Sequence, residues 1–236
     1  MRKILITNDD GINSDGIVRL ARSAKKLGEV WVVAPKEQCS AMSHRITIRE
    51  PIDVFEADFP VEGVHAYATT ATPGDCVRFG ILNIIKEKPD VILSGINFGY
   101  NSGNDIQYSA TVGAAMEGAS RGVLSIAVSE GADGVHEVCD EYLDRMLEEL
   151  VNKPLDYNQI WNLNFPECKL SDFKGILYDR KVSRRGFYED HFDEEPIPGG
   201  LRLHVNGIYQ TNGEEGSDFK ALVDNYISVG IVNNYR

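Results

Sequence analysis

The sequence has no long hydrophobic run and comparatively little positive charge. No apolar stretch among its 236 residues is long enough to span a bilayer, and the N-terminus shows no signal-peptide layout. A formal net charge of −12 argues against electrostatic binding to nucleic-acid polymers and to anionic membrane surfaces. An anionic substrate would therefore need a local positive feature to attract it, such as a metal ion or a helix N-terminus.

Paired cysteines and nucleotide-loop motifs are also missing. There is no CxxC pair, which favours a reduced, cytoplasmic protein over a disulfide scaffold or a zinc site. Neither a Walker A sequence nor a G-x-G-x-x-G after the first strand is present, which disfavours ATP-loop and dinucleotide binding. The cysteines present are Cys39, Cys76, Cys139 and Cys168.

The most informative segment is a short apolar strand that ends on two acids. Residues 4–7 read Ile-Leu-Ile-Thr, typical of a buried parallel strand, and Asp9, Asp10 and Gly11 follow closely. Open α/β sheets bind ligands at the carboxyl ends of such strands. Two carboxylates crowded there are stabilised by a cation between them, and hard divalent cations prefer oxygen ligands. Capping of the next helix by one of these acids is the alternative.

Strands and helices alternate through the first two thirds of the chain. Helical spacing from residue 17 to a stop at Gly28, between strands 4–7 and 30–34, predicts a βαβ unit with parallel strands. Residues 95–104 are rich in Gly and Asn, which predicts an irregular loop. Further expected elements are helices beginning near residues 73, 109 and 135 and strands over 91–94 and 124–128.

The last third is different in character. Short alternating segments over 160–165, 201–205 and 226–229 predict strands, with a charged stretch over 180–200. We therefore expect an α/β fold with a strand-rich C-terminal part, whose hairpins serve as oligomer contacts.

Polar side chains in three predicted loops can converge at the carboxyl edge of the sheet. Asp9 and Asp10 follow the first strand, Ser40 follows the second, and Asn97 and Asn101 follow the third. Carboxylates, a hydroxyl and a carboxamide form an all-oxygen set that suits Mg²⁺, Mn²⁺ or Ca²⁺. Taken separately, Ser40 and Asn97 are equally explained by turn formation.

The helix that begins near Ser109 adds an anion site. Its first backbone N–H groups are unpaired, and Ser109 and Thr111 can donate hydroxyls to the same ligand. Helix capping is the alternative role for Ser109. A metal next to a helix N-terminus suits a phosphomonoester, because the metal activates water while the amides hold the other oxygens.

A longer resemblance rests on ordered motifs along the chain. They are residues 4–11, Ala34-Pro35 followed by Ser40, and residues 72–77, 94–101, 108–118, 217–218 and 226–229. Together these motifs resemble the stationary-phase survival protein SurE, a family of metal-dependent 5′-nucleotidases.

The resemblance implies a Rossmann-like α/β fold, a three-layer parallel sheet. It implies a single domain over 1–236, with a core over about residues 1–152 and a strand-rich part over 153–236. It also implies hydrolysis of nucleoside 5′-monophosphates, with a breadth that includes 3′-monophosphates and short polyphosphate. Family members are homodimers or homotetramers that exchange C-terminal elements.

The resemblance also assigns residues. One divalent metal ion per subunit, Mg²⁺ or Mn²⁺, would be held by Asp9, Asp10, Ser40 and Asn97. Two positions depart from the family pattern, because Ala41 and Ala110 stand where glycine is usual. Each adds a methyl group near backbone that approaches the phosphate, which bears on rate and specificity rather than on reaction class.

The leading hypothesis is a divalent-metal phosphomonoesterase. Its catalytic residues are Asp9, Asp10 and Asn97, and Asn101, Ser109 and Thr111 bind the substrate phosphate. A haloacid-dehalogenase-type phosphatase is one alternative, although its acids typically lie two residues apart. A nucleotide-binding regulatory module without catalysis is the other. The sequence leaves open the preferred base, the metal and the choice between dimer and tetramer.

Overall fold

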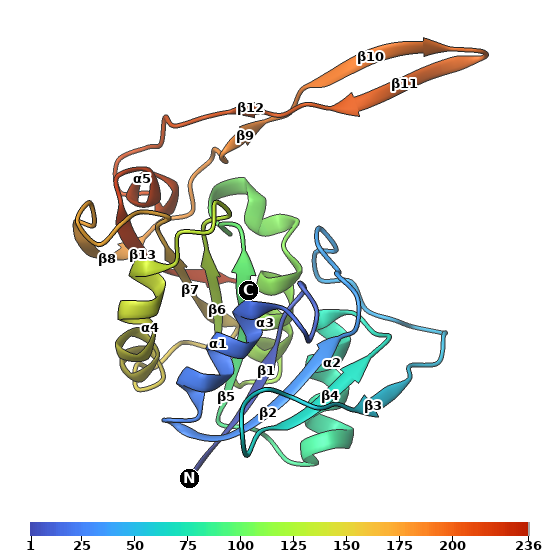
Figure 1. The fold of residues 1–236 in the computed structure, drawn as a ribbon, viewed down its shortest axis with the longest axis vertical. Helices are drawn as coiled ribbons and strands as arrows, with labels where there is room; N and C mark the ends of the chain where they lie inside the picture. Colours follow the sequence, from blue (N-terminus) through green and yellow to red (C-terminus); the bar gives the residue numbers. More distant parts are fainter. Residues whose placement is uncertain (236) are drawn as a thin grey trace.

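The computed structural model describes residues 1–235, and its central feature is a nine-stranded sheet (Figure 1). The strands are β1 (Arg2–Thr7), β2 (Gly28–Pro35), β3 (Val54–Glu56), β4 (His65–Thr69), β5 (Val91–Phe98), β6 (Leu124–Glu130), β7 (Gln159–Phe165), β8 (Gly175–Arg180) and β13 (Tyr226–Asn233). Their order is β3-β4-β2-β1-β5-β6-β7-β13-β8. The run from β4 to β7 is parallel, while β3 and β13 pair antiparallel with β4 and β7.

Helices cover both faces of this sheet. Helices α1 (Asp15–Ala24) and α4 (Glu137–Leu150) lie on one face, and α2 (Pro73–Phe79) and α3 (Ala110–Ser120) on the other. Successive β1 side chains alternate between the two cores, as strand geometry requires: Ile4 and Ile6 pack with α1 and α4, and Leu5 with α2 and α3. The expected α/β three-layer arrangement is confirmed.

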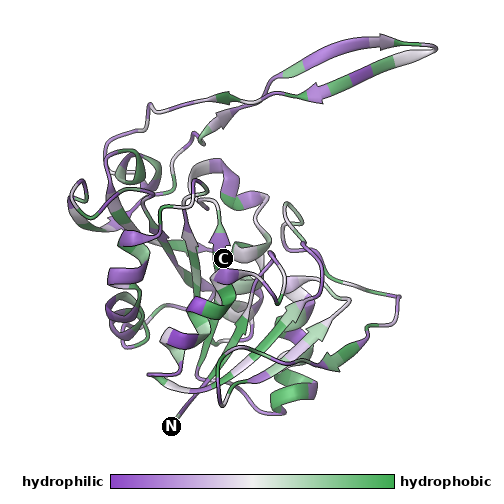
Figure 2. Cartoon of the chain, in the orientation of Figure 1, coloured by the Kyte–Doolittle hydropathy of each residue, from purple (hydrophilic) through white to green (hydrophobic). Residues whose placement is uncertain are grey.

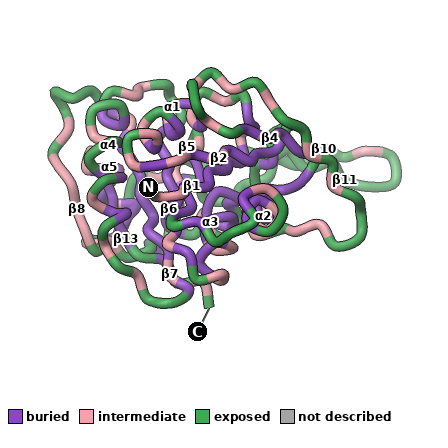
Figure 3. Tube along the Cα trace, turned by 90° about the horizontal axis from the view of Figure 1, so that it is seen from below, coloured by how far each residue is buried: buried purple, intermediate pink, exposed green. Residues whose placement is uncertain are grey.

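The central strands are buried on both sides. Figure 2 shows them largely hydrophobic, and Figure 3 shows the same strands buried under the helices. This explains why the sequence presents them as near-continuous apolar runs rather than as alternating patterns.

Two expected boundaries were wrong. The first helix ends at Ala24, and Gly28 instead begins β2, where a Cβ would lie 2.2 Å from the Arg2 carbonyl oxygen. Strand β5 does not stop at residue 94. It continues to Phe98 with a register shift after Ser94, because pairing with β6 overrides the poor strand propensity of Gly and Asn. Only the later part of the predicted loop remains irregular, before the 3₁₀ turn η2 (Gly103–Gln107).

The C-terminal third is strand-rich, as expected, but it also contains a helix that the sequence did not reveal. Helix α5 (Asp218–Val223) is capped by Ser217, whose side chain accepts a hydrogen bond from the Lys220 N–H. A hairpin of β10 (Phe192–Ile197) and β11 (Gly200–Val205) extends away from the body above the short pair β9 (Tyr188–Glu189) and β12 (Ile208–Tyr209) (Figure 1). The division near residue 152 stays a prediction, and β7, β13 and β8 continue the main sheet.

Two further features of the described chain bear on the sequence analysis. The four cysteines are free and buried. None of the helices in residues 1–235 combines the length and the apolar character needed to cross a membrane.

Candidate metal and phosphate site

The candidate site lies where the sheet changes its direction of winding. Strands β2 and β4 follow β1 on one side, and β5, β6 and β7 continue on the other. Such a switch point opens a crevice at the carboxyl ends of the two central strands. Asp9 and Asp10 follow β1 directly, and Asn97 lies near the end of β5.

Asp9 is the buried member of the acidic pair, with only 3% of its surface exposed. The Thr111 hydroxyl donates a hydrogen bond to its Oδ1 at 2.5 Å, and the Cys39 N–H donates to its carbonyl oxygen at 2.7 Å. Burial raises the pKa of Asp9 to about 6. The charge of Asp10 adds to this rise, and the hydrogen bonds from Thr111 oppose it.

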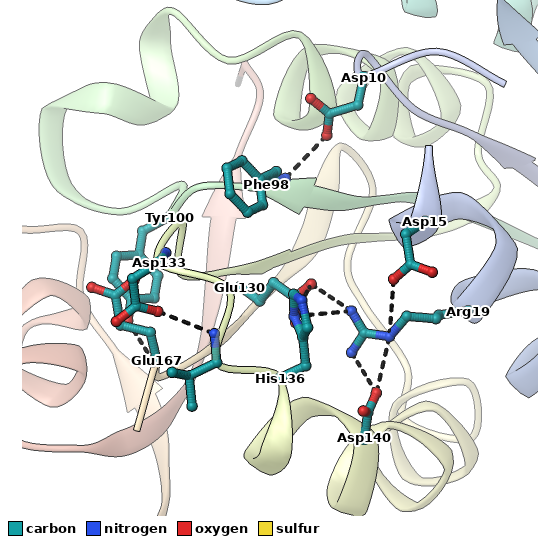
Figure 4. A network of polar contacts seen from close by, with 11 residues as sticks. Asp10, Asp15, Arg19, Phe98, Tyr100, Glu130, Asp133, His136, Asp140 and Glu167 are labelled. Carbon is teal, nitrogen blue, oxygen red and sulfur yellow. Dashed lines mark hydrogen bonds and ion pairs between the residues drawn. The ribbon is translucent and has the colours of Figure 1, made fainter. Parts of the chain in front are cut away.

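Asp10 is half-buried and points toward the tip of β5. The Phe98 N–H donates to its Oδ2 at 3.0 Å (Figure 4), and the Gln38 amide approaches its Oδ1 at 3.5 Å. Burial also raises the pKa of Asp10. Within residues 1–235, no Lys, Arg or His side chain forms an ion pair with either aspartate.

Asn97 and Asp9 share a contact with one hydroxyl group, that of Thr111. Asn97 Nδ2 donates to the Gly99 carbonyl oxygen at 2.7 Å, and its Oδ1 lies 3.3 Å from the Thr111 hydroxyl. One hydroxyl therefore contacts both the Asp9 carboxylate and the Asn97 amide oxygen. Side chains from β1, β5 and α3 meet at this point, and a metal-binding role for them stays a prediction.

Ser40 lies on the loop after β2 and is exposed. The preceding residue, Cys39, forms a backbone hydrogen bond with Asp9. Among the described residues it forms no hydrogen bond to the aspartates. The loop is conformationally unusual, because Ala41 and Ser43 have φ of 57° and 52°. Ser43 fixes it through its N–H, which donates to the Tyr108 carbonyl oxygen at 2.9 Å.

The N-terminus of α3 closes the site on the other side. Ser109 is the N-cap and accepts a hydrogen bond from the Val112 N–H at 3.0 Å, so the capping role is realised. Gly113 lets α3 approach the Ser40 loop, since a Cβ there would lie 2.5 Å from the Ser43 carbonyl oxygen. Ala110 is the first residue of the helix and is buried.

Asn101 faces the interior of the protein. Its Nδ2 donates to the Ser129 hydroxyl at 2.8 Å, and its N–H donates to Asn164 Oδ1 at 2.9 Å. Asn162 and Asn164 in turn donate to its carbonyl oxygen. Asn101 thus ties the loop after β5 to β6 and β7, while the predicted phosphate contact stays a prediction.

The residues present fit a divalent metal ion. Two carboxylates without a cationic partner, a carboxamide oxygen and a nearby hydroxyl form a hard-oxygen donor set. In the part of the chain that the structure describes, no group of three or more His, Cys, Asp or Glu side chains is placed to hold a metal. The choice of Mg²⁺ or Mn²⁺ stays a prediction.

Two features of the site escaped the sequence analysis. The first is the backbone N–H of Phe98, a donor to Asp10 that carries no sequence signature. The second is the contact of Thr111 with Asp9 and Asn97 in addition to its predicted place near a phosphate. The one sequence feature that could have indicated these contacts is the position of Thr111 in the first turn of α3.

The fold and the positions of these side chains together define a class: three-layer Rossmann-like α/β proteins with acidic side chains at the switch point of the sheet. A family model described as "Survival protein SurE" matches residues 4–187, and the chain belongs to the SurE family.

Relatives along almost the whole chain agree with this assignment. The chain is similar to the "5′-nucleotidase SurE" of Thermosipho melanesiensis, with 39% identity over 230 residues, covering 96% of this chain and 89% of the relative. The protein of the same description from Clostridium botulinum is 39% identical over 233 residues, covering 96% and 90%. The crystal structure of the SurE protein from Aquifex aeolicus matches with a TM-score of 0.84 and 33% identity, covering 98% of this chain and 93% of that one.

Proposed function

We propose that this chain is a divalent-metal-dependent 5′-nucleotidase that hydrolyses nucleoside 5′-monophosphates to nucleoside and phosphate. The observation that carries the proposal is the meeting of Asp9 and Asn97 at the Thr111 hydroxyl, beside Asp10 and the N-terminus of α3. The description of the relatives as 5′-nucleotidases supports the same activity.

One Mg²⁺ or Mn²⁺ per subunit would be held by Asp9, Asp10, Asn97 and Ser40. When bound, such an ion polarises a phosphoryl oxygen and lowers the pKa of water. The two aspartates need this positive charge, because they lie side by side without a cationic side chain and burial disfavours their ionised forms.

The chain's own groups orient the substrate. We assign the phosphate to the N-terminus of α3, where the helix dipole attracts an anion and where Ser109 and Thr111 lie. In the free protein the Thr111 hydroxyl donates to Asp9 and the Val112 N–H donates to Ser109, so a bound phosphate would take over donors that these contacts now use. The carboxylate oxygens of Asp9 and Asp10 orient the attacking water. Asn101 fixes the loop after β5 behind the phosphate.

The proposed substrate range follows from the part of the substrate that these groups contact. These groups address the phosphoryl end and leave the rest of the monoester free, so we extend the proposal to 3′-monophosphates and short polyphosphate. Phosphate release from nucleoside 5′-monophosphates, 3′-AMP and tripolyphosphate, each with Mg²⁺, Mn²⁺ or EDTA, tests it. Nucleotide binding without phosphate release under all of these conditions would instead support a binding module.

The first prediction concerns Asp9. Asp9→Asn removes one ligand charge and should lower kcat by about 1,000-fold or more, because the cation loses its most buried anionic ligand. The melting temperature should not fall, since a buried unpaired carboxylate is replaced by a neutral group. Asp58→Asn, at an exposed position in the β3–β4 connection, is the matched control and should keep full activity. Nucleotidase activity retained in Asp9→Asn would contradict the assignment.

We also propose that the chain forms a homodimer or homotetramer through its C-terminal hairpin. The hairpin exposes Leu201, Leu203 and Val205 on one face of β11, and Phe192 opposite Val205 continues that face on β10. A lone two-stranded hairpin is only marginally stable in water, so a second copy that covers this face would stabilise it.

A further inference from the structure

A cavity of about 270 Å³ lies at the same switch point, on the α1 side of Asp10. Three separate elements enclose it: the N-terminus of α1, the end of β5, and the segment that joins β6 to α4. Figure 4 shows this region, with Asp10 above Phe98 and the Glu130, His136 and Arg19 cluster beside them. The side chains that decide its chemistry are Asp10, Ser14, Asp15, Phe98, Glu130 and His136.

We propose that this cavity is the base-recognition pocket of the enzyme and that it selects bases that carry an exocyclic amino group. The base would stack on Phe98 and donate its amino N–H to the carboxylates of Glu130 and Asp15. This inference rests on the nucleotidase function proposed above, since Asp10 belongs to both the metal site and the cavity wall.

Phe98 provides the stacking surface. Its N–H is bound to Asp10, which anchors the residue at the site, yet 56% of its surface is exposed. Two residues further on, Tyr100 is packed against Phe187 with ring centroids 4.9 Å apart. The chain therefore uses one aromatic ring in its interior and leaves the other open at the rim of the cavity, where a base can cover it.

Glu130 provides the acceptor. It is only 4% exposed, and its Oε1 accepts a hydrogen bond from Arg19 at 2.5 Å and lies 3.1 Å from His136 Nδ1. Its Oε2 is buried and has no hydrogen-bond partner among the described residues. The nearby Cys139 thiol, whose pKa is raised chiefly by burial and also by Glu130, is at best a weak donor. A buried carboxylate oxygen whose one neighbouring donor is a thiol is costly. A ligand N–H would satisfy it once the side chains that cover Oε2 from the cavity move aside.

The position of Arg19 fixes which oxygen is free. Arg19 also donates to Asp140 at 2.5 Å and lies 3.7 Å from Asp15, so its guanidinium is held between α1 and α4 (Figure 4). Oε1 of Glu130 is thereby committed to Arg19, and Oε2 remains for a ligand. With Asp15 at the mouth and Asp10 in the wall, the carboxylate acceptors of the pocket outnumber its donors, which are the Ser14 hydroxyl and the His136 ring. Adenine, cytosine and guanine offer amino groups to such acceptors, whereas hypoxanthine and uracil offer carbonyl oxygens instead.

The test compares matched substrates in the full-length protein with Mg²⁺. We would measure kcat/KM for AMP, IMP, CMP, UMP and ribose 5-phosphate, the last of which has no base. The wild type should prefer AMP over IMP and CMP over UMP by about tenfold, the effect of one hydrogen bond to a charged group.

Two variants probe the two halves of the pocket. Phe98→Ala should lower kcat/KM for AMP about tenfold more than it lowers kcat/KM for ribose 5-phosphate, because the stacking surface serves only the substrate that carries a base. Phe55→Ala, another half-exposed phenylalanine on the edge strand β3, is the control and should change neither. Glu130→Gln keeps an oxygen for Arg19 and places an NH₂ group where Oε2 lies. It should therefore reverse the preference toward IMP and UMP.

Three results would overturn the proposal. The first is equal kcat/KM for AMP and IMP in the wild type. The second is an unchanged ratio of kcat/KM for AMP to that for IMP in Glu130→Gln. The third is an equal loss of kcat/KM on AMP and on ribose 5-phosphate in Phe98→Ala. Failure of the nucleotidase function itself would show as no phosphate release from any monoester. Calorimetric titration of the same proteins with AMP, IMP and ribose 5-phosphate would then test the pocket through the ratios of the dissociation constants.

Discussion

At the scale of single residues, Thr111 connects the parts of the site. Its hydroxyl lies 2.5 Å from Asp9 Oδ1 and 3.3 Å from Asn97 Oδ1, and it is fully buried. The sequence placed Thr111 near a phosphate, but its contacts with the candidate metal ligands depend on how α3 packs against β1 and β5. A side chain that orients metal ligands affects metal affinity without being a ligand itself.

Thr111→Val should therefore weaken metal binding about 10- to 100-fold, because the isosteric side chain cannot hydrogen-bond to Asp9. Thr111→Ser keeps the hydroxyl and serves as the control. Titration of kcat/KM against Mg²⁺ concentration measures the effect. An unchanged Mg²⁺ requirement in Thr111→Val would refute the positioning role.

The two alanines at which the sequence departs from the expected family pattern differ in backbone conformation. Ala41 has a φ of 57°, a left-handed conformation that disfavours Cβ, whereas Ala110 is the buried first residue of α3. Ala41→Gly should stabilise the protein by about 1 kcal/mol, and Ala110→Gly should destabilise it by about 0.5–1 kcal/mol. Urea denaturation of both variants checks the signs. Shifts in the same direction would show that backbone conformation does not decide these positions.

At the scale of elements, the site depends on the close packing of α3 against the Ser40 loop. Gly113 permits the contact, and Ser43 holds the loop to the segment before Ser109. The proposed metal ligand Ser40 on the loop and the proposed anion site on the helix are thus positioned by one contact between elements far apart in sequence.

Gly113→Ala should push the loop away from α3, since its Cβ would lie 2.5 Å from the Ser43 carbonyl oxygen. We expect a loss of about 2 kcal/mol of stability together with weaker metal binding. Gly200→Ala is the matched control, because the nearest atom to its Cβ is 3.9 Å away in the hairpin. Thermal melts with and without Mg²⁺ measure both effects. Equal melts for the two variants would contradict the close-approach argument.

At the scale of the whole molecule, the hairpin is the part of the fold that a single chain leaves uncovered. Its polar face pairs Glu195 with Arg202 and His204, while the opposite face exposes Leu203. This difference between the two faces supports the proposed assembly through the hairpin.

Leu203→Asp should therefore lower the molecular mass in solution to that of a monomer at micromolar concentration, because it places a second carboxylate directly opposite Glu194 on the face that carries the leucines. Arg202→Gln, on the opposite face, should leave the mass unchanged. Light scattering coupled to size-exclusion chromatography measures both. A wild type that is already monomeric would remove the basis of the proposed assembly.

The sequence by itself determined the parallel core, the acidic strand end and the cap of α3, because apolar runs, adjacent acids and capping residues act through neighbours along the chain. It also carried the motifs by which the family is identified. The extension of β5 to Phe98, the helix α5 and the contacts of Thr111 and Phe98 were decided by tertiary structure. Each depends on a strand or helix that lies far away in sequence. Backbone pairing and close packing between such elements form only when the chain has folded into the complete sheet with its covering helices.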